Sequence, residues 1–206
     1  DMNIGTAKPT LEEMQGIKHY LLDFVSPDER YSVADYKRDA KKAIKEIIAK
    51  GKTPIIVGGT GLYVDSLIYE IEYQDIEFDE KYRNELEEIA KKNGLEKLYE
   101  RINLRVDIMM QQGLVQEVKN IVQKYNKFPT AMQGLGYKEV VDYLEGKCTE
   151  QEMIEKIKME TRRYAKRQLT WFRKNKQTIW LDGSKDRQNN VDIILEGINW
   201  KKKQKK

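Results

Sequence analysis

The stretch that most constrains the fold is residues 54–63, which read PIIVGGTGLY. A run of β-branched apolar residues that a proline precedes and glycines follow is typical of a buried strand that turns sharply into a helix, here beginning near Leu62. Glycines let the backbone approach a ligand closely, and a helix start presents unpaired N–H groups. The stretch is therefore either a phosphate site, to which Thr60 adds a hydroxyl, or only a tight connection between strand and helix.

The segments before this stretch alternate in the manner of a parallel α/β sheet. Residues 19–23 and 53–57 are predicted strands. Between them, a helix is predicted to begin at the capping-box pair Ser32 and Asp35 and to end at Gly51. Ligands bind at the carboxyl ends of the strands in such sheets, where the glycines lie. We therefore expect an α/β fold, and 206 residues are enough for one sizeable core.

The second half of the chain is predicted to be mostly helical, because apolar residues recur there at helical spacing. The predicted helices are residues 79–93, 95–112, 114–125, a helix that ends at Gly146, 149–175 and 191–200. A short helix at residues 10–16, with the capping-box pair Thr10 and Glu13, and a last strand at residues 178–181 complete the prediction.

The long helix is the second feature that points to function. Residues 156–176 hold nine basic residues and one acid, Glu160. At about 100° per residue, six of the basic residues cover an arc of about 140° opposite an apolar face. They are Arg162, Arg163, Lys166, Arg167, Arg173 and Lys174. Because a solvated face usually mixes both signs, we interpret this strip as a contact for nucleic acid or pyrophosphate, with solubility as the alternative.

Composition excludes several kinds of site. Cys148 and His19 are the only residues of their types, so neither an intramolecular disulfide nor a Cys/His zinc site can form within one chain. No apolar run approaches the roughly 20 residues of a membrane span, and the first residues lack a signal-peptide pattern. We expect a cytoplasmic protein that does not contact membranes.

Four motifs together resemble those of the bacterial tRNA dimethylallyltransferases, which are isopentenyl-tRNA transferases with a P-loop core. They are NIGTAKP at residues 3–9, VGGTGLY at 57–63, GLGYKE at 134–139 and RYAKRQLTWFR at 163–173. The motifs are spread over most of the chain in the order of the family, whereas each alone is a weak signal.

The resemblance implies a P-loop-type parallel sheet flanked by helices, with a mostly helical insert that is incomplete here. The family's first strand, its G-x-x-x-x-G-K-[ST] loop and the aspartate regarded as its general base belong before Asp1, and most of the insert belongs near residue 94. The chain is either a fragment with an internal deletion or a set of joined segments, which we favour. The expected catalytic core is residues 1–78 and 95–206, and residues 79–94 begin the tRNA-binding insert.

The resemblance also implies the reaction. A monomer would transfer a dimethylallyl group from dimethylallyl diphosphate to N6 of the adenine 3′ to the anticodon, position 37, in the anticodon stem-loop of tRNA. Mg²⁺ and the P-loop would bind the diphosphate, with no metal ligand in the present sequence. Thr60 would be the catalytic hydroxyl that donates a hydrogen bond to the bridging oxygen as the C–O bond breaks.

The resemblance also implies the remaining site residues. Arg163, Lys166 and Arg167 would contact the diphosphate or the RNA phosphates. The residues expected to contact substrate or tRNA are Gly5, Thr6, Lys8, Gly58, Gly59, Arg83, Gln133 and Lys138. For Arg83 the alternative is a solvated charge, and for Gln133 and Lys138 it is a plain corner between helices.

Two other classes of function stay open at this point. A P-loop nucleotide kinase or phosphotransferase would use the same strand, glycine turn and cationic helix for ATP, without RNA. A non-catalytic RNA-binding fragment would use the cations alone. Turnover with dimethylallyl diphosphate and tRNA distinguishes both from the transferase.

Overall fold

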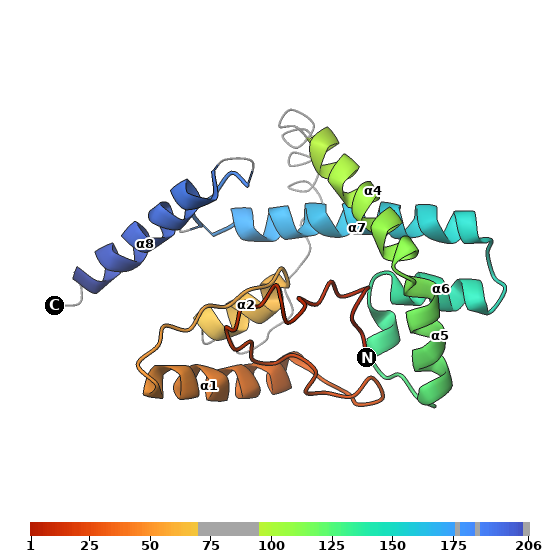
Figure 1. Ribbon diagram of the computed structural model, residues 1–206, viewed down its shortest axis with the longest axis horizontal. Coiled ribbons are helices and arrows are strands. Elements are labelled where there is room, and N and C mark those ends of the chain that lie inside the picture. Colours follow the sequence, from red (N-terminus) through yellow and green to blue (C-terminus); the bar gives the residue numbers. More distant parts are fainter. Residues whose placement is uncertain (70–94, 176–177, 184–185, 204–206) are drawn as a thin grey trace. The chain divides into compact units, whose positions relative to one another are not determined.

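The computed structural model describes residues 1–69, 95–175, 178–183 and 186–203, and within these ranges every regular element is helical (Figure 1). The chain forms two compact units, Asp1–Trp171 and Phe172–Lys206. The predicted start of the insert at residues 79–94, which includes Arg83, lies outside the described residues. The candidate site is built from the larger unit.

Most helices begin and end close to their predicted bounds. They are α1 Val33–Ala49, α2 Gly61–Ile68, α4 Leu95–Gln111, α5 Leu114–Lys124, the 3-10 helix η1 Ala131–Gln133, α6 Tyr137–Leu144, α7 Glu150–Arg173 and α8 Arg187–Lys203. Gly113 separates α4 from α5, because its φ of +93° is a left-handed conformation that favours glycine. The predicted break between these two helices is therefore confirmed.

Capping boxes begin two of the predicted helices. The Asp35 N–H donates to Ser32 Oγ at 3.3 Å, and the Ser32 N–H donates back to Asp35 Oδ2 at 3.0 Å, at the start of α1. Thr149 and Glu152 make the same reciprocal pair at the start of α7. Each pair satisfies N–H groups that the first helical turn leaves without a partner.

The third capping box does not lead to a helix. Thr10 and Glu13 make the reciprocal hydrogen bonds at 2.8 and 3.2 Å, but residues 11–16 form turns. Gln15 and Gly16 have φ values of +50° and +73°, which a right-handed helix does not contain. The prediction of a helix at residues 10–16 was wrong because a cap cannot extend a helix beyond one turn without packing.

The segment predicted as the first strand is a bent loop. Leu21 and Asp23 have φ values of +61° and +51°, far from the values of a β-strand. Lys8 forms an ion pair with Asp23, which holds the bend against the start of the chain. The prediction of a strand at residues 19–23 was therefore wrong, and this segment is a loop.

The two other predicted strands, residues 53–57 and 178–181, also lack a ladder of backbone hydrogen bonds. Ile55 and Val57 are 79% and 88% exposed, and Ile179 is 67% exposed. A strand is stable only when its backbone groups pair with a neighbouring segment, and no described segment pairs with either stretch. The described residues therefore do not form the predicted sheet.

The core of the larger unit lies among α4, α5, η1, α6 and the first half of α7 (Figure 1). Its buried residues are Val106, Met109, Leu114, Val118, Ile121, Met132, Tyr137, Val140, Met153 and Ile157. Residues from five elements meet in one apolar cluster, so the removal of water from these side chains holds the helices together.

Helices α1 and α2 form a second packed pair (Figure 1). The rings of Tyr36 and Tyr63 stack with centroids 4.4 Å apart and an interplanar angle of 19°. Ala40 and Ala43 of α1 are buried, which lets the helices approach closely. This pair supports the glycine-rich stretch, because α2 begins at Gly61.

We expect Val118→Ala to lower the free energy of unfolding by about 2 kcal/mol, since it removes two fully buried methyl groups and leaves a cavity. Val122→Ala is the matched control on the same helix, because Val122 is 40% exposed and Val118 is 0% exposed. Urea unfolding of both variants measures the difference. Equal losses would contradict the placement of the core.

Candidate functional site

The glycine corner, defined as residues 58–61, lies against α7. The Gly59 carbonyl oxygen accepts a hydrogen bond from Gln168 Nε2 at 2.7 Å, and Thr60 Oγ1 lies 3.4 Å from the Tyr164 hydroxyl. Tyr164 and Gln168 are four residues apart and so share one face of α7. The two features that the sequence analysis singled out are therefore in direct contact.

Trp171 continues the same face of α7, three residues beyond Gln168. Its indole Nε1 donates to Asp65 Oδ2 at 2.8 Å, and its ring covers Gly61. Asp65 belongs to α2, so α7 holds both the glycine corner and the helix that follows it. Tyr164 and Trp171 lie on the apolar face opposite the basic strip, and their role as partners of the corner was not predicted.

The three glycines of the corner have different reasons to be glycine. A Cβ atom at Gly59 would lie 2.0 Å from Gln168 Nε2, and one at Gly61 would lie 2.2 Å from Trp171 Cδ1. A Cβ atom at Gly58 would meet no atom within 4 Å. The rigid Trp171 ring therefore explains glycine at position 61, whereas the flexible end of Gln168 can move away from a Cβ atom at position 59, and Gly58 borders open space.

Thr60 presents a hydroxyl group that helix α2 does not use. It is the N-cap residue of α2, yet its side chain makes no capping hydrogen bond and is exposed. Arg167 Cζ lies 5.7 Å from the centroid of the Tyr164 ring, within cation–π range, and the Tyr164 hydroxyl is the group beside Thr60. A hydroxyl donor and a guanidinium thus flank the same tyrosine.

Acids neutralise two lysines in the first part of α7 and one arginine of the basic strip. The ion pairs are Lys156 with Asp142 at 2.9 Å, Lys158 with Asp107 at 2.8 Å and Arg163 with Glu160 at 2.6 Å. The hydrogen bond from Lys156 lowers the pKa of the Asp142 carboxyl below its usual range. Lys156 and Lys158 precede the six residues of the strip, so the ion pairs from α6 and α4 leave its interpretation a prediction, and within the strip Arg163 has an acidic partner.

The predicted phosphate ligands on α7 do not all face the glycine corner. Lys166 lies two residues after Tyr164, about 200° around the helix, whereas Arg167 lies about 60° from it. In the described part of the chain, no acid pairs with Lys166 or Arg167. Arg162 donates to Asn103 Oδ1 at 2.7 Å, which directs it towards α4. Arg167 is therefore the predicted cation best placed for a ligand at Thr60.

The predicted residues of the first motif each have a contact within the chain. Thr6 Oγ1 donates to the Met2 carbonyl oxygen at 2.7 Å, Lys8 pairs with Asp23, and Gly5 packs beneath the Tyr137 ring. Thr6 and Lys8 also line a cleft of about 360 Å³ with residues 21–27, Thr130 and Ala131 among others. Thr6 and Lys8 therefore border a cavity, and Gly5 does not line it.

Gln133 and Lys138 lie on either side of the turn between η1 and α6, and both are exposed. The turn is held by a hydrogen bond of 2.9 Å from the Gly136 N–H to Glu139 Oε2, with φ of +88° at Gly136. This geometry fits the alternative of a corner between helices. Contact with tRNA stays a prediction for both side chains.

Neither a cluster of metal-ligating side chains nor a membrane-spanning helix occurs in the described part of the chain. It contains no group of three or more His, Cys, Asp or Glu side chains that could hold a metal ion. Within the same residues, no helix combines the length and the apolar character that crossing a bilayer requires. The described residues therefore do not by themselves fit a Mg²⁺ site.

The four motifs meet in two pairs. In the first pair, Gly5 of the first motif packs against Tyr137 of the third, and the Ile4 N–H donates to Glu117, which is the hydrogen-bond partner of Tyr137. In the second pair, Thr60 of the second motif contacts Tyr164 of the fourth. The sequence pattern of the family described as IPP transferase matches residues 1–100 and 94–175. The chain belongs to the IPP transferase family. The resemblance inferred from the motifs is confirmed.

Relatives and solved structures agree with this family. The tRNA dimethylallyltransferase of Acetivibrio thermocellus is 39% identical over 265 residues, which cover 97% of this chain and 84% of the relative. The full-length tRNA isopentenylpyrophosphate transferase of Bacillus halodurans superposes with a TM-score of 0.82 and 35% identity, over 99% of this chain and 84% of that chain. The Staphylococcus epidermidis tRNA delta(2)-isopentenylpyrophosphate transferase gives 0.82 and 32%, over 97% and 86%.

We expect Gly61→Ala to lower the free energy of unfolding by about 1–3 kcal/mol, because its Cβ atom would collide with the Trp171 ring and force α7 away from the corner. Gly58→Ala is the matched control within the same corner and should leave the melting temperature unchanged. Thermal unfolding followed by circular dichroism measures both. Similar behaviour of the two variants would contradict the close contact between Gly61 and α7.

Proposed function

We propose that the protein transfers a dimethylallyl group from dimethylallyl diphosphate to N6 of the adenine 3′ to the anticodon of tRNA. The names of its relatives, tRNA dimethylallyltransferase and tRNA isopentenylpyrophosphate transferase, support this reaction class. The observation that carries the proposal is the contact of Thr60 with Tyr164, because it brings an exposed hydroxyl that does not cap α2 beside a helix that carries Arg167.

The chemistry requires groups of these types. An N6–C bond forms as the C–O bond to the diphosphate breaks, and N6 gives up one proton to a base. An exocyclic amine is a poor nucleophile, so the site must accept its proton and stabilise the charge of the leaving diphosphate. Thr60 would donate a hydrogen bond to the bridging oxygen, and Arg167 would balance the phosphate charge. The family resemblance implies that an aspartate would accept this proton.

The RNA substrate requires a second set of contacts. The target adenine must leave its stack to reach the diphosphate, which costs a few kcal/mol and is easiest in a single-stranded loop. Lys166 faces away from Thr60 around the helix, so it suits RNA phosphate better than diphosphate. Thr6 and Lys8 border the cleft of about 360 Å³ and would meet the anticodon loop there.

Three further expectations belong to this proposal. Mg²⁺ would be bound by the diphosphate and the P-loop. The steps described above assign no residue of this chain as a ligand of Mg²⁺. Residues 53–57 would join the parallel sheet of the family, which would bury the exposed Ile55 and Val57 side chains. The protein would act as a cytoplasmic monomer.

The direct test is incubation of the full-length protein with labelled dimethylallyl diphosphate, tRNA and Mg²⁺, followed by digestion to nucleosides and mass spectrometry. We expect N6-dimethylallyladenosine from tRNA with A37 and no product from tRNA with G37. A parallel reaction with labelled ATP tests the kinase alternative. Binding of tRNA without any transfer would favour the RNA-binding alternative and overturn the proposal.

Thr60→Ala should lower kcat about 100-fold with little loss of tRNA affinity, because the lost hydrogen bond would strengthen only as the diphosphate departs. Thr60→Ser keeps the hydroxyl and should retain most of the activity. Steady-state kinetics and a separate tRNA binding assay measure the two effects. Equal losses of kcat and tRNA affinity in Thr60→Ala would rule out the catalytic role.

Arg167→Ala should reduce the dependence of RNA or diphosphate binding on salt, because Arg167 is a cation without a described acidic partner. For RNA, the slope of log K against log salt should become shallower by about one unit. Lys156→Ala is the control on the same helix, since Asp142 already neutralises Lys156. If Lys156→Ala changes the slope as much as Arg167→Ala, charge pairing does not decide which cations bind phosphate.

A further inference from the structure

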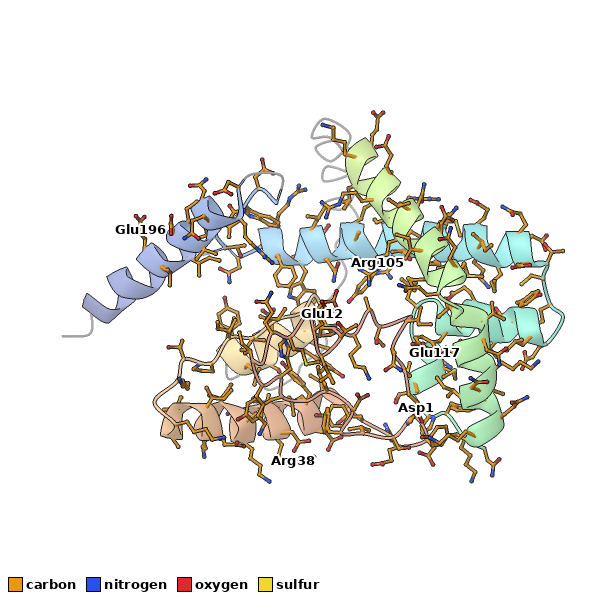
Figure 2. All side chains as sticks on the ribbon, viewed as in Figure 1. Asp1, Glu12, Arg38, Arg105, Glu117 and Glu196 are labelled. Carbon is orange, nitrogen blue, oxygen red and sulfur yellow. The ribbon has the colours of Figure 1, made fainter. Side chains whose placement is uncertain are left out.

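Glu117 of α5 binds the N-terminal loop, defined as residues 3–8, across more than 110 residues of sequence (Figure 2). Its carboxylate accepts hydrogen bonds from three consecutive backbone N–H groups. They are those of Asn3 to Oε2 at 2.9 Å, Ile4 to Oε2 at 2.9 Å and to Oε1 at 3.1 Å, and Gly5 to Oε1 at 3.4 Å. Successive N–H groups that converge in this way form a concave anion site, and here a side chain of the same protein occupies it.

Tyr137 of α6 completes this contact from the core. Its hydroxyl donates to Glu117 Oε1 at 2.7 Å, and only 1% of the residue is exposed. Burial, followed by the hydrogen bond to Glu117, raises the pKa of the Tyr137 phenol, so the hydroxyl keeps its proton at neutral pH. A Cβ atom at position 5 would lie 2.2 Å from the ring, so only glycine allows the loop to lie this close.

The loop held in this way borders a cleft built from strained backbone. Ala7, Leu21 and Asp23 all line the cleft of about 360 Å³, and their φ values are +49°, +61° and +51°. Non-glycine residues keep such conformations only where neighbouring contacts enforce them, and they gather at ligand sites. Of these residues, Ala7 donates its N–H to the Ile4 carbonyl oxygen at 3.0 Å, next to the Glu117 contact, and Asp23 forms an ion pair with Lys8.

We propose that Glu117 and Tyr137 are positioning residues that hold the N-terminal loop in the shape that accepts the anticodon loop of tRNA. The identity of this ligand rests on the proposed function. Apolar packing alone would hold a loop to a core without orienting its peptide groups, whereas three N–H bonds to one carboxylate fix the backbone direction. We call the contact of Glu117 and Tyr137 with residues 3–5 the clamp. A loop that is ordered in advance spares the entropy cost of ordering on binding, so the clamp acts on tRNA affinity.

The first test compares Glu117→Gln with Glu100→Gln, an exposed glutamate on α4, in the full-length protein. A glutamine amide turns its NH₂ group towards at least one of the loop N–H groups, so part of the clamp is lost. We expect Glu117→Gln to weaken tRNA binding about tenfold and to speed amide hydrogen exchange at residues 3–5 by a similar factor. The kcat at saturating tRNA and the KM for dimethylallyl diphosphate should not change.

A second variant approaches the contact from the loop. Gly5→Ala should weaken tRNA binding in the same way. The double variant with Glu117→Gln should lose no more tRNA affinity than the single variant with the larger loss, because both substitutions disrupt the same contact. Circular dichroism confirms that each variant is folded. Faster exchange at residues 3–5 with unchanged tRNA affinity would overturn the positioning role, as would unchanged exchange.

These readouts separate this inference from the proposed function. Wild-type protein that binds tRNA but transfers no prenyl group would overturn the proposed function, and the affinity comparison would still decide the role of the clamp. Wild-type protein that does not bind tRNA would overturn both. Normal transfer by wild type, with unaltered tRNA affinity in Glu117→Gln, would overturn only the clamp.

Discussion

The packing of α7 is the interaction on which the rest of the larger unit depends. The first half of this helix buries Met153 and Ile157 in the cluster formed with α4, α5 and α6. Its second half presents Tyr164, Gln168 and Trp171 to the glycine corner and α2. One rigid element therefore joins the hydrophobic core to the candidate site, and any change that tilts α7 alters both.

Charge along α7 is distributed to match these two roles. Near the core, acids from α4 and α6 pair with Lys158 and Lys156, so these two cations are neutralised there. Near the glycine corner, Arg167 lies over an aromatic ring, which leaves its charge largely uncompensated. Surface ion pairs contribute little to stability individually. Their main effect here is to limit the positive potential to the end of the helix that meets the corner.

Local chemistry predicted the helices well and long-range contacts poorly. The Ser32 and Thr149 capping boxes and the break at Gly113 depend on residues within one turn, so they are visible in sequence. The strands depend on partners, and the apolar pattern at residues 53–57 says nothing about which segment pairs with it. The same limit applies to the site. The corner and α7 were identified separately, but neither the Glu117 clamp nor the acids that neutralise α7 leave a local signal.

The contacts of the glycine corner also set an order for folding. Gly59 and Thr60 find their partners on Gln168 and Tyr164, more than 100 residues later in the chain. During synthesis, the nascent chain therefore exposes the corner and α2 without their support until α7 has left the ribosome. Contacts of such long sequence separation form slowly, because the intervening chain must close first. Assembly of the glycine corner should accordingly be a late event in folding, after α4, α5 and α6 have formed their local core.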